Sequence, residues 1–202
     1  NEQFLRRLNR QLNVTATAQP TPELTIDLTA DRQYVETLQE NFSITQGVYT
    51  PQAPNTFGNF SVSTLMLKTA FKPGDVNRSE NFETFKSNRI VIANRLMTDR
   101  GAEDLGLDQD GYPIQYGKTH QDVLLPAFFA AYTGQDAERV NLGVFRDLPI
   151  PNWNLKYTGL MKSKWFKKRF KRFSLSHGYQ SMYTINAFQT NLERYQLLQE
   201  GL

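Results

Sequence analysis

The feature that most constrains the fold is a long period-two alternation near the C-terminal end of the sequence. Over the sixteen residues Phe173–Phe188, successive side chains belong to two alternating sets, as on the two faces of a strand. At about 3.4 Å per residue, this segment reaches roughly 50 Å. Strands of soluble proteins average about five or six residues, whereas about 9–11 tilted residues cross a bilayer. The alternation therefore predicts one long strand of membrane-spanning length.

Shorter segments predict further strands. Residues 12–18 and 24–30 alternate around a Pro-rich turn, which predicts a β-hairpin with a thin apolar face. Phe60–Phe71 predicts a third strand, and Trp153–Tyr157 predicts a short strand later in the chain. Gly47–Asn59 contains two prolines, two glycines and two asparagines, and this composition predicts a loop.

The middle of the chain has a helical period instead. An apolar stripe predicts a helix over roughly Glu80–Thr98, and a more uniformly apolar segment predicts a second, largely buried helix over Gln121–Tyr132. Thr119 and Asp122 resemble a capping box at the start of the second helix, and Gly134 suits its C-terminal cap.

The order of these segments predicts a mainly β fold with a helical insert (α+β). We expect a β-hairpin and strand segment over 1–75, a helical insert over 76–148, and a basic segment leading into the long strand over 149–202. No apolar run approaches the roughly 18 residues that a transmembrane helix needs. The sequence contains no cysteine, which excludes disulfides, thiolate metal ligands and cysteine nucleophiles.

The formal net charge of +3 is unevenly distributed. Leu148–Leu192 contains eight Lys or Arg residues and no Asp or Glu, so the remainder carries fifteen basic and twenty acidic residues. A basic segment set against a mildly acidic remainder indicates a polyanion, an anionic membrane surface or an acidic partner near the C-terminal quarter.

Most of these cations are interleaved with aromatic residues. One interpretation is nucleic-acid binding, in which cations contact phosphates and rings stack on bases. A second is adsorption to anionic lipid, and a third is a solvated turn with amphipathic packing. The flanking strand of membrane length favours lipid, so we expect a membrane-interface or anion-binding patch and no nucleic acid. The predicted patch is Lys164, Trp165, Phe166, Lys167, Lys168, Arg169, Phe170, Lys171 and Arg172.

Three aromatic residues of the long strand carry a further prediction. Tyr179, Tyr183 and Phe188 suit the aromatic girdle of an outer-membrane barrel. We therefore expect the strands to be antiparallel and to form part of a large transmembrane β-barrel.

Two motifs resemble catalytic or nucleotide sites only superficially. Ser176 and His177 are neighbours in a predicted strand, where they would point to opposite faces, and no carboxylate lies nearby in the sequence. Gly117–Thr119 resembles the end of a phosphate-binding loop, but Tyr112 occupies the position that requires glycine.

An acidic segment resembles a calcium loop equally weakly. Asp104, Asp108 and Asp110 precede a glycine, but their spacing differs from that of an EF-hand and the bidentate Glu is missing. The other carboxylates are scattered, so no acid/base pair is nominated. We expect no enzymatic activity, no cofactor and no metal site.

Six blocks of the sequence are long and distinctive, and they follow one another in order between residues 58 and 183. They are Gly58–Ser61, Phe85–Arg89, Gln121–Gly134, Pro151–Leu160, Phe166–Lys171 and Ser174–Tyr183. Together they resemble the SprA/Sov family, the giant outer-membrane barrel proteins of the type 9 secretion system, which are also named for gliding motility.

The resemblance implies that the chain is a slice of the C-terminal part of a very large outer-membrane translocon barrel. In that family, folded cargo leaves the periplasm through the pore, an accessory barrel engages a lateral opening, and a plug protein lies at the periplasmic mouth. The expected partners are the rest of the same barrel, outer-membrane lipid, secreted cargo, and the accessory barrel and plug proteins. The implied function is protein export and support of gliding motility, without enzymatic activity.

The resemblance also implies where the helical region and the basic segment lie relative to the barrel. The helical region Glu80–Tyr132 would be an insertion packed on or in the barrel, and Lys162–Arg172 would lie at a membrane–water boundary. The alternative is a soluble α+β binding module with a basic aromatic anion-binding patch.

Overall fold

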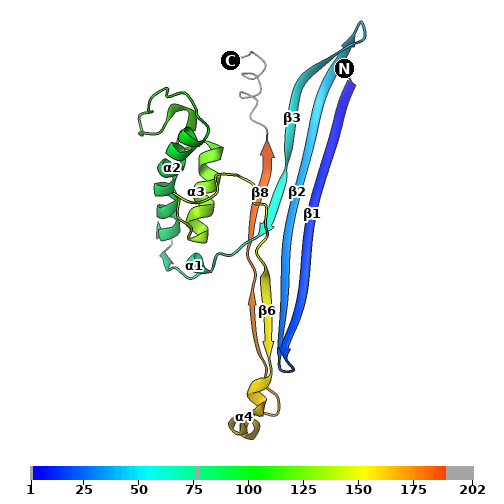
Figure 1. Cartoon of the computed structure of the whole chain (residues 1–202), viewed down its shortest axis with the longest axis vertical. Helices are drawn as coiled ribbons and strands as arrows, with labels where there is room; N and C mark the ends of the chain where they lie inside the picture. The colour runs from blue at the N-terminus through cyan, green and yellow to red at the C-terminus, as the bar shows by residue number, and fades with distance from the viewer. Residues whose placement is uncertain (1, 76–77, 190–202) are drawn as a thin grey trace. The chain divides into compact units, whose positions relative to one another are not determined.

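The computed structural model of the chain describes residues 2–75 and 78–189 (Figure 1). The fold is α+β, with a mainly antiparallel β-sheet and a few helices, as the sequence predicts. The chain divides into two compact units. The sheet unit comprises Asn1–Thr64 and Leu148–Leu202, and the helical unit comprises Leu65–Asp147.

The sheet unit holds six strands and two short helices. They are β1 (Glu2–Thr21), β2 (Leu24–Thr45), β3 (Val48–Ser63), β6 (Asn152–Tyr157), η2 (Gly159–Lys162), α4 (Lys164–Arg169), β7 (Leu175–Tyr179) and β8 (Met182–Gln189).

The helical unit is continuous in sequence. Its elements are α1 (Leu67–Ala70), β4 (Gly74–Asp75), β5 (Arg78–Ser79), α2 (Glu80–Asp99), η1 (Ile114–Tyr116) and α3 (Gln121–Thr133). The helical insert expected over 76–148 begins eleven residues later than this unit, and its residues 76–77 lie outside the described part of the chain. The end of the expected C-terminal segment, 190–202, also lies outside it.

The sheet is antiparallel, and two of its strand positions are each shared by two segments. β1 pairs with one edge of β2 over most of its length. The other edge of β2 pairs first with β6, over Leu24–Thr29, and then with β3, over Arg32–Thr45. β7 pairs with β6, and β8 pairs with β3. β3 and β6 therefore follow one another along β2, and β7 and β8 follow one another beside them (Figure 1).

The hairpin predicted over 12–18 and 24–30 is confirmed, and its strands are longer than predicted. The loop predicted over Gly47–Asn59 is wrong, because this segment is most of β3. Gln46 and Gly47 turn the chain with positive φ values of 54° and 80°, which suits a two-residue hairpin turn. Pro54, which has no N–H to donate, falls where the β2–β3 register shifts, so the bulge accommodates it.

The strand predicted over Phe60–Phe71 is also wrong beyond Ser63, where the chain leaves the sheet. Backbone groups around this exit are hydrogen-bonded to the neighbouring strands. The Ser63 carbonyl accepts from the Ile150 amide at 2.9 Å, and the Ser63 hydroxyl accepts from the Asp31 amide at 3.1 Å. The hydrogen bonding of the sheet therefore continues at the point where the helical unit is inserted in the sequence.

The single strand predicted over Phe173–Phe188 is divided in the structure. β7 and β8 are separated at Gln180 and Ser181. Ser181 lies at the junction of β3 and β6: its amide donates to the Asn152 side-chain oxygen at 2.9 Å, and its carbonyl accepts from the Thr64 amide at 3.2 Å. The strand changes partner here, which explains why its ladder is interrupted while its direction is kept.

The part of the sheet formed by β1, β2, β6 and β7 has one polar and one apolar face. Directly opposed residues share a face, so the pairing registers assign each residue. Besides the tyrosines, His177 is the one polar residue within the apolar face, and Arg32 lies opposite Leu12 at its end. The apolar face consists of Leu12, Val14, Ala16, Ala18, Leu24, Ile26, Leu28, Ala30, Trp153, Leu155, Tyr157, Leu175, His177 and Tyr179. The polar face consists of Asn13, Thr15, Thr17, Thr25, Asp27, Thr29, Asp31, Asn152, Asn154, Lys156, Ser176 and Gly178.

The two helices predicted in the middle of the chain are confirmed as α2 and α3. Gly134 caps α3 with the left-handed φ of 67° that the sequence predicts. The capping box predicted at Thr119 is wrong, because the N-cap is His120, whose side chain accepts from the Asp122 amide. Buried residues of the helical unit include Ile92, Ala93, Leu96, Val123, Ala127 and Ala130.

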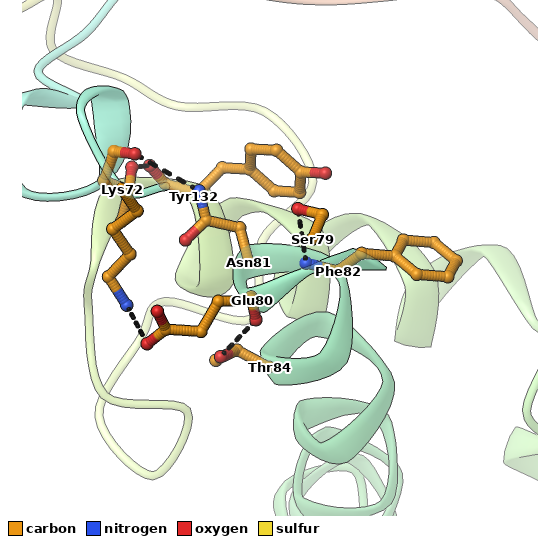
Figure 2. Close-up of polar contacts among 8 residues, drawn as sticks. Lys72, Ser79, Glu80, Asn81, Phe82, Thr84 and Tyr132 are labelled. Atoms are coloured by element: carbon orange, nitrogen blue, oxygen red, sulfur yellow. Dashed lines mark hydrogen bonds and ion pairs between the residues drawn. The ribbon is translucent and has the colours of Figure 1, made fainter. Parts of the chain in front are cut away.

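Polar contacts join the start of α2 to α1 and α3 (Figure 2). The Ser79 hydroxyl caps α2 by accepting from the Phe82 amide. The Asn81 side chain donates to the Thr69 carbonyl at 3.3 Å, and the Thr69 hydroxyl donates to the Tyr132 carbonyl. These bonds satisfy backbone groups at helix ends, which otherwise lack partners. No helix among the described residues is long and apolar enough to cross a bilayer.

Candidate functional site

The predicted cationic patch lies in the segment that joins β6 to β7, residues 158–174, which we call the basic loop. Its centre is α4, and not part of an extended strand. The Lys167 amide donates to the Ser163 carbonyl at 3.1 Å, and the Phe170 amide donates to the Phe166 carbonyl at 2.8 Å. Lys167, Lys168 and Arg169 occupy the last turn of α4, where the negative end of the helix dipole favours cations.

Four aromatic rings of the basic loop pack against one another. The centroids of Trp165 and Phe166 are 4.9 Å apart, and those of Phe166 and Phe173 are 5.1 Å apart. Phe170 completes the cluster at 5.5 Å from Phe173. Trp165 is 55% exposed and Phe170 is 40% exposed, so the cluster presents much of its ring surface to the surroundings.

The cations of the basic loop are interleaved in the sequence with the residues of this aromatic cluster. The Arg169 guanidinium lies 5.3 Å from the Trp165 ring centroid, in a cation–π contact. Apart from Lys162, the other cations of the loop have exposed side chains and form no ion pair within the described part of the chain. They are Lys164, Lys167, Lys168, Lys171 and Arg172.

The basic loop is attached to the turn between β1 and β2. The Lys162 ammonium lies 2.5 Å from a Glu23 carboxylate oxygen. The Thr158 amide donates to the Glu23 carbonyl at 2.9 Å. Gly159 lies against the Tyr157 ring, since a Cβ on Gly159 would stand 2.4 Å from the Tyr157 hydroxyl oxygen. These contacts hold the basic loop at the end of the sheet where the apolar face finishes with Tyr157.

Acidification is expected to release the Lys162–Glu23 contact. The hydrogen bond from Lys162 lowers the pKa of Glu23 below its ordinary 4.5, with desolvation opposing it. A pKa lowered by folding stabilises the contact above the ordinary value, and this stabilisation is lost as the pH falls through the folded-state pKa. An NMR titration of the Glu23 carboxyl should give a midpoint below 4.5, and Lys162→Gln should move it upward. An unchanged midpoint in Lys162→Gln would contradict the contact.

The predicted strand aromatics lie apart from the basic loop. Tyr183 lies opposite Val62, and Val62 lies opposite Arg32. Arg32 is nine residues from Glu23, where the basic loop is attached, and nine residues of strand span roughly 30 Å. Tyr183 is buried, with only 4% of its surface exposed. Its ring meets Phe60 edge-on, at 6.4 Å between centroids.

Phe188 lies on the same face as Tyr183, although strict alternation predicts the opposite face. The β3–β8 register shifts between Gly58 and Phe60, and Ala187 has a positive φ of 53°. A bulge of this kind turns the next side chain over. Phe188 consequently stacks on Tyr34, with ring centroids 5.7 Å apart.

Tyr179 belongs to the apolar face and stacks on Trp153, with ring centroids 4.6 Å apart. The indole N–H of Trp153 donates to Nδ1 of His177 at 3.3 Å. This bond joins two polar groups of the apolar face to each other. Sequence reasoning did not nominate Trp153 or Tyr157 as site residues, although their period-two spacing with Leu155 was the signal available.

The polar face is hydrogen-bonded across strands and contains a hollow. Thr17 donates to Asp27 at 2.8 Å, and the Asn13 amide donates to Asp31. Gly178 has no side chain beside Asn154, and a hollow of about 450 Å³ lies here. Residues lining it include Asp27, Thr29, Asn152, Asn154, Gly178 and Gln180.

The other sequence motifs are engaged in local contacts. Lys118 pairs with Asp110 at 2.5 Å, and the Asp110 hydrogen bond raises the pKa of Lys118. The Asp108 carboxylate accepts from the amides of Asp110 and Tyr112. Ser176 lies on the polar face, opposite to His177. Within 2–75 and 78–189, no group of three or more His, Asp or Glu residues could hold a metal ion.

No protein-family model matches the chain, and no curated protein sequence matches it.

Proposed function

We propose that the chain forms part of the wall of a large outer-membrane β-barrel that exports folded proteins through the type 9 secretion system and supports gliding motility. The resemblance of six sequence blocks to the SprA/Sov family suggests the identity of the barrel. The observation that carries the proposal is the two-faced sheet, whose apolar face is partly exposed and whose polar face is rich in hydroxyl and amide groups.

The exposure of the apolar face supports contact with lipid. Val14 on β1 is 48% exposed and Leu175 on β7 is 53% exposed, at opposite edges of the same face, whereas Leu28 between them is partly exposed and Ala30 is buried. A soluble protein rarely leaves a continuous apolar surface of this kind uncovered. In a membrane barrel, the lipid-facing residues are apolar and alternate with polar residues that face the lumen.

The height of the apolar face supports the same assignment. It spans seven residues on β1, from Leu12 to Ala18, which corresponds to about 20–24 Å. Outer-membrane barrels carry an apolar band about 25 Å tall. On the same side of the sheet, Arg32 lies opposite Leu12, and Arg10 and Glu36 lie beyond it on β1 and β2. At this level the same side of β3 and β8 carries the buried residues Phe60, Val62, Tyr183 and Ile185.

The sheet edges support a larger assembly. Among the described residues, β1 pairs only with β2, and β7 and β8 pair only with β6 and β3. Each unpaired peptide group costs several kcal/mol in lipid, so both edges require further strands. We assign these strands to the rest of the same barrel. The other partners in the proposal are outer-membrane lipid, secreted cargo, an accessory barrel and a periplasmic plug protein, and the proposed role is not enzymatic.

Lipid quenching of single tryptophans tests the proposal. The chain has only two tryptophans. Trp165→Phe leaves Trp153, on the apolar face, as the only reporter, and Trp153→Phe leaves Trp165, in the basic loop. We expect the chain to need detergent for a monodisperse, strand-rich state, and phospholipids brominated on their acyl chains to quench Trp153 after reconstitution.

The alternative function predicts the opposite behaviour. A soluble α+β binding module would be a compact monomer without detergent and would unfold cooperatively. Size-exclusion chromatography, light scattering and circular dichroism of the unmodified chain distinguish the two. A detergent-independent monomer whose Trp153 is not quenched would overturn the barrel proposal.

A further inference from the structure

We propose that the basic loop is a binding site for the phosphate groups of anionic phospholipids at one surface of the bilayer. The inference rests on the proposed function in one respect, because both place the apolar face in lipid. It goes further by assigning a lipid class to a defined loop and by fixing the level at which the sheet meets the headgroups.

The charge of the loop carries the first step. Lys164, Lys167, Lys168, Lys171 and Arg172 are exposed and form no ion pair in the described part of the chain. The acidic side chain that the loop does contact, Glu23, is paired with Lys162. Five neighbouring cations without counter-charges repel one another. A surface that supplies phosphate groups would offset this repulsion, which no carboxylate of the described residues offsets.

The aromatic cluster carries the second step. Trp165 and Phe170 are exposed in the middle of the cations, and both rings rest on Phe166, with centroids 4.9 Å and 5.8 Å away. Tryptophan and phenylalanine favour the region between headgroups and acyl chains, where ring surface leaves water while cations reach phosphates. Because the rings already pack together, little side-chain freedom is lost when the cluster inserts.

The position of the loop selects the occupant. The apolar face ends at Tyr157 and Leu175, which lie opposite each other and are both exposed. The basic loop joins these two residues directly. An apolar surface that continues into a band of cations and aromatic rings matches the order of acyl chain, interface and headgroup in a bilayer. A nucleic acid would match only the cations and rings and would leave the adjoining apolar face uncovered.

A competition between two vesicle populations tests the inference. The full chain, carrying Trp153→Phe, is offered vesicles of phosphatidylcholine and vesicles of phosphatidylcholine mixed with phosphatidylglycerol, which are separated afterwards by flotation. Trp165 emission reports insertion. Each cation near an anionic surface contributes about a five-fold factor to binding. We expect Lys164→Gln, Lys167→Gln and Lys168→Gln together to reduce the preference for anionic vesicles about a hundred-fold.

The matched control removes the same charge elsewhere. Lys72→Gln, Lys86→Gln and Lys118→Gln replace three lysines of the helical unit, each of which is paired with a carboxylate. This triple variant should keep the preference for anionic vesicles. Circular dichroism checks that both triple variants retain their strand content, which is expected because all six lysine side chains are on the surface.

Other outcomes would overturn the inference. Equal losses in the two triple variants would show that net charge, and not the basic loop, sets the preference. Displacement by inorganic phosphate beyond that by chloride of equal ionic strength would indicate a site for a free anion. Preference for a single-stranded oligonucleotide over the anionic vesicles would indicate nucleic-acid binding. Trp153 quenching in neutral vesicles, measured separately, shows whether the barrel proposal survives such a result.

Discussion

Gly58→Ala is expected to destabilise the sheet by at least about 3 kcal/mol or to prevent it from forming. Gly58 lies in β3, opposite Glu36 on one side and Phe188 on the other. A Cβ at this position would stand 1.9 Å from the Val35 carbonyl oxygen and 2.7 Å from the end of the Phe188 ring. The first clash is with backbone, so a change of side-chain rotamer cannot relieve it.

Gly178→Ala is the control in the same sheet. The nearest atom to a Cβ on Gly178 is the Asn154 side-chain oxygen at 3.9 Å, an ordinary van der Waals contact. We expect a change within about 0.5 kcal/mol. Strand content after refolding into detergent, followed by circular dichroism and denaturant titration, measures both variants. If Gly58→Ala matched Gly178→Ala, the close approach of β3 to Val35 would not exist in the protein.

Sequence patterns predicted elements whose determinants are local. The helices α2 and α3 follow from their apolar spacing, and the cap at Gly134 follows from the freedom of glycine at positive φ. The β1–β2 hairpin follows from two alternating segments around a Pro-rich turn. Each of these depends on residues close in the sequence.

The predictions that failed depend on partners distant in the sequence. Gly47–Asn59 is a strand because β2 offers a long edge and a bulge accommodates Pro54. Phe188 turns to the face of Tyr183 because of the bulge at Ala187, which alternation alone cannot indicate. β3 and β6 share a position along β2 although 88 residues separate Ser63 from Asn152. No local sequence pattern can indicate that two segments so far apart pair with the same strand.

The candidate site divides in the same way. The interleaving of cations and aromatic rings in the sequence identified the residues of the patch. Its attachment to Glu23 was not predicted, because that residue lies more than a hundred positions away, in a turn whose Pro-rich sequence indicates a hairpin but no contact with the basic loop. The loop's position beside Tyr157 and Leu175, where the apolar face ends, likewise emerges only from the pairing of β6 with β7.

Leu28→Arg is expected to weaken insertion of the sheet into a bilayer by about 2–4 kcal/mol, whereas Thr29→Arg is expected to change it little. Leu28 lies in the middle of the apolar face, opposite Ala16 on β1 and Trp153 on β6. A guanidinium at this position would be placed in hydrocarbon, far from water. Thr29 is the next residue, on the polar face and exposed, so its replacement would extend toward the lumen of the proposed barrel.

The pair separates lipid contact from general destabilisation because both variants introduce the same side chain into the same strand. Folding into lipid vesicles, titrated with urea and followed by Trp153 fluorescence, measures the difference between them. A large loss for Leu28→Arg alone would identify the apolar face as the side of the sheet that contacts lipid. Equal effects of the two variants would mean that the faces are not distinguished by their surroundings, and the assignment of the apolar face to the bilayer would have to be abandoned.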